Sequence, residues 1–164
     1  MKKILISTAV LGGVGIFAYS IYRYIKIQAN LLKDFSYRIL DFGIEESSLQ
    51  KVKGTMKVLF TSNSDIEITV QDFIVDFFVD GEKIGYIEDK GAFLVPARSS
   101  SEIGFAYTLN PQLVFTNITD LVSGALENND ISFQIKGFAT LKSGFIKVSL
   151  PIEYETTLKE FLAS

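Results

Sequence analysis

Apolar and polar residues alternate along most of the chain after residue 35, with the period of two that is typical of a strand with one buried face. The alternation is regular over residues 51–60, 66–70, 73–79, 103–109, 131–136 and 146–154, and each stretch is predicted to form a β-strand. The apolar positions change from even to odd numbers between Ile66–Val70 and Phe73–Val79. Because a shift of one residue turns every side chain over, we predict a β-bulge or bend near Val70–Asp72.

Turn signals separate the predicted strands. Asp80-Gly81 lies between two apolar alternations and predicts a hairpin, since glycine accepts a positive φ. The return strand of this hairpin is built around Ile84, Tyr86 and Ile87. Lys142-Ser143-Gly144 predicts a second tight connection, between the last two strands.

One helix is predicted among the strands. Asn110 is a favourable N-cap, and Pro111 suits the first helical position. Apolar residues then recur at helical spacing and form one stripe, which consists of Val114, Ile118, Leu121, Val122 and Ala125. With about seven strands and this helix, the sequence predicts a mainly β fold, a small antiparallel β-sandwich over residues 34–155. Residues 156–164 are predicted to form a frayed or lightly docked tail.

The amino-terminal segment has a different pattern, because residues 4–21 carry no charge. At about 1.5 Å per residue, a helix of this length covers most of the roughly 30 Å hydrocarbon core of a bilayer. We therefore predict a transmembrane anchor and short helical stalk over residues 1–33. The anchor's apolar residues include Ile4, Leu5, Ile6, Val10, Leu11, Val14, Ile16, Phe17 and Ile21. Basic and aromatic residues that suit the membrane interface flank it, namely Lys2, Lys3, Tyr19, Tyr22, Arg23, Tyr24 and Lys26.

Two other interpretations of this segment remain open. It could be a signal peptide cleaved near Ala18-Tyr19-Ser20, although the helical pattern continues beyond that site through Tyr22 and Ile25. It could also be a buried helix of a soluble protein, although no bundle partner for it follows. A retained anchor is the favoured interpretation. The side of the membrane is undetermined, because the basic residues at the two ends nearly balance.

Composition restricts the possible chemistry. The chain has 164 residues, a net charge of −3, and no histidine or cysteine. It therefore lacks the commonest general base, the commonest transition-metal ligand and the thiol nucleophile. Binding to nucleic acid has little electrostatic support. No constellation of serine and carboxylates indicates a hydrolase, so we expect no enzyme activity, cofactor, metal or nucleic-acid partner.

Several turn motifs resemble one known family. They are the runs TSNSD at 61–65, DGEKIG at 80–85, VPARSSS at 95–101 and QIKG at 134–137, together with the long strand between the first two. Over residues 34–154 the chain is similar to the late embryogenesis abundant group 2 family, which is related to the water-stress and hypersensitive-response domain. One departure is Ser64, which stands where family members usually have proline. The resemblance implies a non-catalytic domain, in many members tied to a membrane and associated with stress protection, lipid contact or protein binding.

One predicted strand carries a candidate surface. Asp72, Asp76 and Asp80 are spaced by four residues, about 13 Å along a strand, so they cannot share a metal ion and are predicted to form a solvated face. Ile74 and Phe78 lie between them, and apolar residues on a polar face suggest a partner-binding surface. Alternatively, the predicted helix covers them, or both faces of the sheet pack there. Glu45-Glu46 and Glu88-Asp89 are predicted to be solvated loop charges.

These observations lead to one favoured function and two alternatives. The favoured function is a non-catalytic, single-pass membrane protein whose β-sandwich acts as a binding or scaffold module. The first alternative is a minor structural protein of a large membrane-containing assembly such as a virion, and the second is a lipid-binding domain with an acyl-chain cleft between its sheets. The expected partners are a lipid bilayer and a protein, either a second copy or a neighbour in an assembly.

Overall fold

The computed structural model describes residues 19–27, 29–30, 33–48, 50–114 and 131–163. The strands are β1 (Phe35–Ser47), β2 (Val52–Ser62), β3 (Ile68–Val79), β4 (Glu82–Asp89), β5 (Phe93–Val95), β6 (Ser99–Leu109), β7 (Ser132–Ser143) and β8 (Ile146–Thr157). They are followed by the helix α3 (Leu158–Ala163), and the 3-10 helix η1 (Pro111–Leu113) follows β6. The predicted mainly β, antiparallel fold is confirmed.

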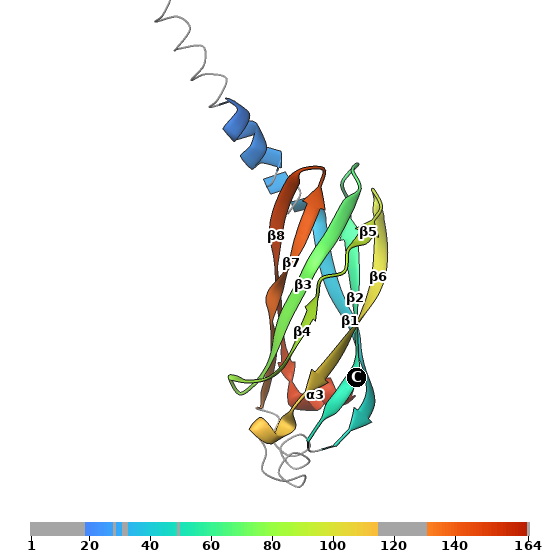
Figure 1. Ribbon diagram of the computed structural model, residues 1–164, viewed down its shortest axis with the longest axis vertical. Helices are drawn as coiled ribbons and strands as arrows, with labels where there is room; N and C mark the ends of the chain where they lie inside the picture. Colours follow the sequence, from blue (N-terminus) through green and yellow to red (C-terminus); the bar gives the residue numbers. More distant parts are fainter. Residues whose placement is uncertain (1–18, 28, 31–32, 49, 115–130, 164) are drawn as a thin grey trace, which may run out of the picture.

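All eight strands belong to one sheet with the order β1-β2-β6-β4-β3-β7-β8, and β5 pairs with β3. The sheet curls into a sandwich, in which β1, β2 and β6 face β3, β7 and β8 (Figure 1). Rings from opposite layers meet in the centre: Phe60 contacts Phe73, and Phe42 contacts Phe133. The alternation in the sequence arises because one face of each long strand packs into this interior.

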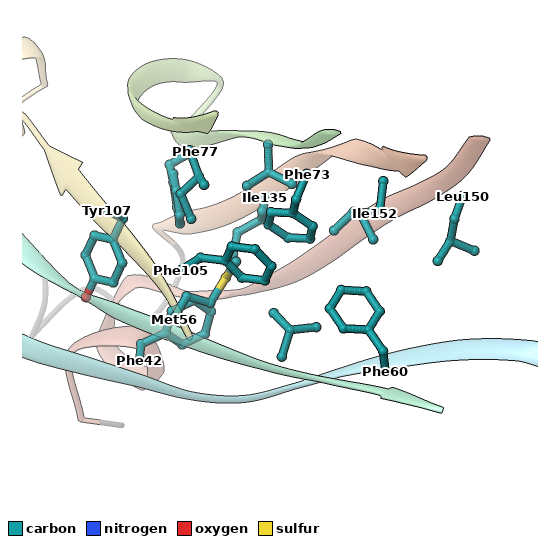
Figure 2. Packing of buried hydrophobic residues seen from close by; sticks show 14 of the residues in the cluster. Phe42, Met56, Phe60, Phe73, Phe77, Phe105, Tyr107, Ile135, Leu150 and Ile152 are labelled. Carbon is teal, nitrogen blue, oxygen red and sulfur yellow. The ribbon is translucent and has the colours of Figure 1, made fainter. Parts of the chain in front are cut away.

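Aromatic side chains fill the space between the layers. Phe60, Phe73, Phe77, Phe105 and Phe133 are all fully buried. Phe73 and Phe105 are stacked with 3.9 Å between their ring centroids, and Figure 2 shows both beside the neighbouring Met56. Burying a ring of this size contributes about 1.5–3 kcal/mol, so this cluster is the main source of stability.

The two layers are joined differently on their two sides. On one side, β4 and β6 pair over only two positions, Gly85 with Leu109 and Tyr86 with Thr108. On the other side, β1 and β8 are the edge strands, and the Tyr37 hydroxyl connects them. It accepts a hydrogen bond from the Glu153 backbone N–H at 2.7 Å and donates one to the Glu153 carbonyl at 3.0 Å.

Three turn predictions are confirmed. The pairing of β3 with β7 shifts register between Gln71 and Ile74, and Asp72 has a φ of 47°, which places the predicted bulge. Asp80 and Gly81 both have positive φ, as a type I′ hairpin requires. Gly144 also has a positive φ, at 60°, in the turn between β7 and β8.

The structure adds detail to two expectations. The predicted return strand is β4, and a register shift between Phe77 and Phe78 in the β3–β4 pair buries Ile84 and exposes Tyr86. The predicted tail is part of the fold, because α3 buries Leu158 and Phe161. The Phe161 ring stacks on Phe133 with centroids 3.9 Å apart.

The helix predicted after Asn110 begins as expected. The Asn110 side chain accepts a hydrogen bond from the Gln112 N–H at 3.2 Å, and Pro111 opens η1. The remainder of the predicted stripe, from Ile118 to Ala125, lies outside the described residues.

The amino-terminal segment is described from residue 19. Residues 19–27 and 29–30 are helical, and Ile27 packs against the core. The predicted span up to residue 18, with Lys2 and Lys3, lies outside the described residues. Within the part of the chain that is described, no helix combines the length and apolar character needed to cross a bilayer.

Candidate functional site

The outer face of β3, β4, β7 and β8 presents its side chains in regular rows. Strand pairing brings four side chains together in the first row, and these are Pro151, Phe138, Ile74 and Glu88. The second row contains Glu153, Lys136, Asp76 and Tyr86, and the third contains Glu155, Gln134, Phe78 and Lys83. An apolar row therefore adjoins a row of alternating charge.

Ile74 and Phe78, which the sequence predicts as a partner surface, lie on this face and are half-buried. Phe138 lies directly opposite Ile74 on β7 and keeps 39% of its surface exposed. Tyr86, on β4, keeps 59% exposed. We define Ile74, Phe78, Tyr86 and Phe138 as the outer apolar patch.

Two members of the patch were not predicted. Phe138 follows Gln134 and Lys136 at even positions, on the polar face of its strand, so the criterion that identified Ile74 also applies to it. The sequence pattern does not mark Tyr86 in this way, because the bulge at Ile84 moves Tyr86 to the opposite face of β4. The alternation in the sequence already marks Phe138, whereas the exposure of Tyr86 follows only from the pairing register of β3 and β4.

Charged side chains hold the patch in place. Lys83 Nζ lies 2.6 Å from Asp76 Oδ1 and 5.4 Å from the centroid of the Tyr86 ring. Lys136 Nζ lies 5.8 Å from the centroid of the Phe78 ring, a distance that permits a cation–π interaction. A lysine ammonium therefore lies over the ring of Tyr86 and another over that of Phe78, while Phe138 and Tyr86 remain exposed to solvent.

Asp72, Asp76 and Asp80 do not form one solvated row. Asp76 pairs with Lys83, and Asp72 lies in the bulge. The Asp80 carboxylate accepts a hydrogen bond from the Ser132 N–H at 3.0 Å and thereby ties the β3–β4 hairpin to β7. Within the described ranges, no three acidic residues are grouped closely enough to hold a metal ion.

An open groove adjoins the patch where β4 and β6 separate. Its volume is about 870 Å³, and its lining includes Tyr86, Glu88, Lys90, Leu109 and Leu113. Lys90 forms an ion pair with Glu88, which raises the pKa of Lys90. Because Tyr86 and Glu88 belong both to the groove and to the rows above, the two features form one continuous surface.

Elsewhere in the domain, the pKa of a buried tyrosine is raised and the pKa of an exposed carboxyl is lowered. Burial raises the pKa of Tyr107 to about 12, with a smaller effect from the carboxylates of Asp41 and Glu45. The Tyr107 hydroxyl donates a long hydrogen bond of 3.4 Å to the Gly43 carbonyl. On the surface, the Arg98 guanidinium beside Asp65 lowers the pKa of that carboxyl. Neither group adjoins the patch.

The predicted interface residues that are described lie on the amino-terminal helix. Tyr19, Ile21, Tyr22 and Tyr24 are all exposed, as is their neighbour Ile25. Arg23 and Lys26 are exposed on the same helix. The segment therefore presents aromatic and aliphatic side chains that the described part of the sandwich does not cover.

Comparisons with known proteins agree on the fold. The family model described as "Late embryogenesis abundant protein" matches residues 62–155, more than half of the chain. No match is found among curated proteins. A crystal structure of a protein from Archaeoglobus fulgidus is similar, with a TM-score of 0.53 and 12% identity over 74% of this chain and 92% of that one. A solution structure from Arabidopsis thaliana has a TM-score of 0.51 and 16% identity, over 73% and 77% of the two chains.

Proposed function

Since the chain belongs to the late embryogenesis abundant group 2 family, we propose that it is a non-catalytic, membrane-anchored binding module. Its partner is a protein, and the outer apolar patch is the surface that binds it. The family places no catalytic residues on this chain, and its members share turns and strands rather than reactive groups. Its function therefore depends on the surface that it presents rather than on the fold alone.

One observation carries the proposal: the exposed rings of Phe138 and Tyr86 lie in the middle of a sheet face, the first within its apolar row and the second in the adjoining row. Phe138 and Tyr86 remain exposed although the domain buries most of its other rings. Aromatic residues surrounded by paired charges are typical of the centre of a protein interface, where the ring supplies contact area and the charges supply orientation. The ion pair of Lys83 with Asp76 lies on the polar border of the patch.

The membrane anchor is supported by the charge-free run at residues 4–21. The exposed tyrosines on the following helix also support it, because tyrosine favours the headgroup level of a bilayer. Anchoring would confine the sandwich to a surface and raise its local concentration near a membrane-bound partner.

The alternative of a lipid-binding cleft receives less support. Stacked rings occupy the space between the layers, including Phe73 on Phe105 and Phe133 on Phe161. An acyl chain would have to displace these fully or nearly fully buried side chains. Within the described residues, no feature favours a virion component over a cellular protein.

Site-specific photocrosslinking tests the protein-binding surface. A benzoylphenylalanine at Phe138 in the full-length chain, expressed in its native cell, is expected to give one discrete protein adduct. Leu40 is the matched control, because it lies on β1 in the opposite layer and has the same exposure, 40% against 39%. The variant Ile74→Gln should weaken the adduct, since Ile74 pairs directly with Phe138. Equal labelling from positions 138 and 40 would overturn the proposal.

A further inference from the structure

The turn between β7 and β8 carries the most exposed large apolar side chain of the described residues. Phe145 keeps 92% of its surface exposed. The turn has Gly144 at its first position with a φ of 60°, as in a type II′ hairpin. Such a turn requires glycine at the first position only, and a polar residue would serve at the second. Phe145 is therefore not explained by the folding of the hairpin.

Two lysines flank this phenylalanine. Lys142 and Lys147 are directly opposite each other in the β7–β8 pairing, on the outer face. Like charges in such a pair are destabilising, and neither lysine forms an ion pair with any residue that the structure describes. An exposed ring between two uncompensated cations is suited to an anionic, partly apolar surface.

The position of the turn indicates which surface that is. The amino-terminal helix meets the sandwich at the β2–β3 turn, where Ile27 and Asn30 line a small depression of about 290 Å³ with Asn63 and Ile66. The β7–β8 turn lies beside it, because Ser143 Oγ donates a hydrogen bond to the Glu67 carbonyl at 3.4 Å. Figure 1 shows the helix leaving the sandwich at this same end.

Other exposed apolar residues gather at this end. Ile66, in the β2–β3 turn, and Leu94, on β5, are each exposed by more than 40%. Leu94 pairs with Thr69, which also pairs with Lys142, so Leu94 and the lysines lie in one row across the sheet. We define Ile66, Leu94, Phe145, Lys142 and Lys147 as the helix-end surface.

We propose that the helix-end surface is a second membrane contact, in which Phe145 enters the headgroup region of the bilayer and the two lysines face anionic lipids. The inference rests on the proposed anchor. About ten residues separate Tyr24 from Asp34, so a helical stalk would hold the sandwich within about 15 Å of the headgroups. One phenylalanine binds a bilayer weakly by itself, but the anchor converts its insertion into an intramolecular step with a high effective concentration. The contact therefore sets the orientation of the sandwich. The sheet face that bears the outer apolar patch then stands parallel to the membrane normal and does not lie against the lipid.

A fluorescence experiment on the full-length chain tests this contact. The chain has no cysteine, so Ser143→Cys provides a single site for an environment-sensitive fluorophore while Phe145 is retained. The protein is reconstituted into phosphatidylcholine vesicles with and without phosphatidylserine, and flotation measures its association. Leu113→Cys is the control, because Leu113 is exposed and lies in η1 at the opposite end.

We expect quenching by spin-labelled lipids and a blue shift at position 143, and neither effect at position 113. Adding Phe145→Ser to the labelled chain should abolish both effects without unfolding it, since the ring is exposed. Replacing Lys142 and Lys147 with glutamine should reduce the quenching in anionic vesicles only.

The outcomes separate the two proposals. A chain that floats with vesicles but shows no quenching at 143, or quenching that survives Phe145→Ser, overturns the contact and leaves the anchor intact. A chain that does not float overturns both.

Discussion

The two ends of the sandwich use their apolar side chains in opposite ways. At the α3 end, Phe161 lies on Phe133 and Leu158 is buried, so the chain after β8 covers the core. At the end that bears the amino-terminal helix, Phe145 and Ile66 face outward. Both ends carry aromatic and aliphatic residues on turns or short helices. Apolar character alone therefore does not tell whether a side chain stabilises the fold or is available for binding. The burial of the side chain distinguishes the two.

The largest expected effect comes from removing the ring that closes the α3 end. Phe161→Ala should lower the free energy of unfolding by about 3–5 kcal/mol, because it leaves a cavity against Phe133 and Phe42. Phe145→Ala is the matched control, and its effect should stay within about 0.5 kcal/mol. Urea denaturation in detergent, followed by far-UV circular dichroism, measures both. Similar losses for the two variants would contradict the comparison.

The next effect is a pH dependence at the α3 end, where Tyr107 lies near Phe161. The pKa of Tyr107 is raised from 10.0 to about 12, so the folded state retains its proton above the pH at which the unfolded state loses it. The stabilisation is complete below pH 10 and is lost as pH rises toward 12, with a total of up to about 2 kcal/mol. Denaturation midpoints between these pH values should fall more steeply for the wild type than for Tyr107→Phe. Parallel curves would show that Tyr107 titrates normally.

A smaller effect is expected from the connection between the edge strands. Tyr37→Phe removes both hydrogen bonds to Glu153 and should cost about 1–2 kcal/mol. Hydrogen exchange should rise at the Glu153 amide, which loses its acceptor. An unchanged exchange rate at Glu153 would show that another group replaces the hydroxyl. The neighbouring Arg38→Ala, on the same strand, serves as the control.

The smallest effect is expected at the helix-bearing end. Arg98 and Asp65 form an exposed ion pair beside the β2–β3 turn, and Arg98 lowers the pKa of Asp65. Exposed pairs contribute little, so Arg98→Ala should leave the denaturation midpoint at pH 7 unchanged within error. Titration followed by NMR should instead detect a return of the Asp65 pKa toward its usual value. A clear loss of stability would mean that this end contributes to folding more than its exposure indicates.

The sequence predicted the strands because each long strand has one buried face, and that alternation is local. It predicted the bulge near Asp72 and the turn at Asp80-Gly81 for the same reason, since parity and glycine positions are read from neighbours. It did not predict that α3 packs on the core, although Leu158 and Phe161 already show helical spacing. The tail is predicted to be frayed or lightly docked because it is terminal, and the space beside the Phe133 ring that Phe161 fills depends on the three-dimensional fold.

The candidate surfaces were predicted in part. Ile74 and Phe78 were identified because they interrupt a polar face, and Phe138 met the same criterion. Tyr86 depends on a register shift, and the groove beside it depends on where β4 and β6 separate, so neither could be obtained from periodicity. The hydroxyl of Tyr37 meets Glu153 from 116 positions away in the chain, a pairing that no local pattern specifies.

The Tyr37 hydroxyl also limits how β8 can pair with a strand of another molecule. Edge strands with free backbone groups recruit strands from other molecules, which leads to aggregation. On β8, the outward N–H and carbonyl of Glu153 are already occupied, and two residues earlier Pro151 has no N–H to offer. At these two positions a neighbouring copy would find no free N–H donor, and the Glu153 carbonyl is taken as well, so the run of backbone groups that strand addition needs is interrupted in the middle of β8.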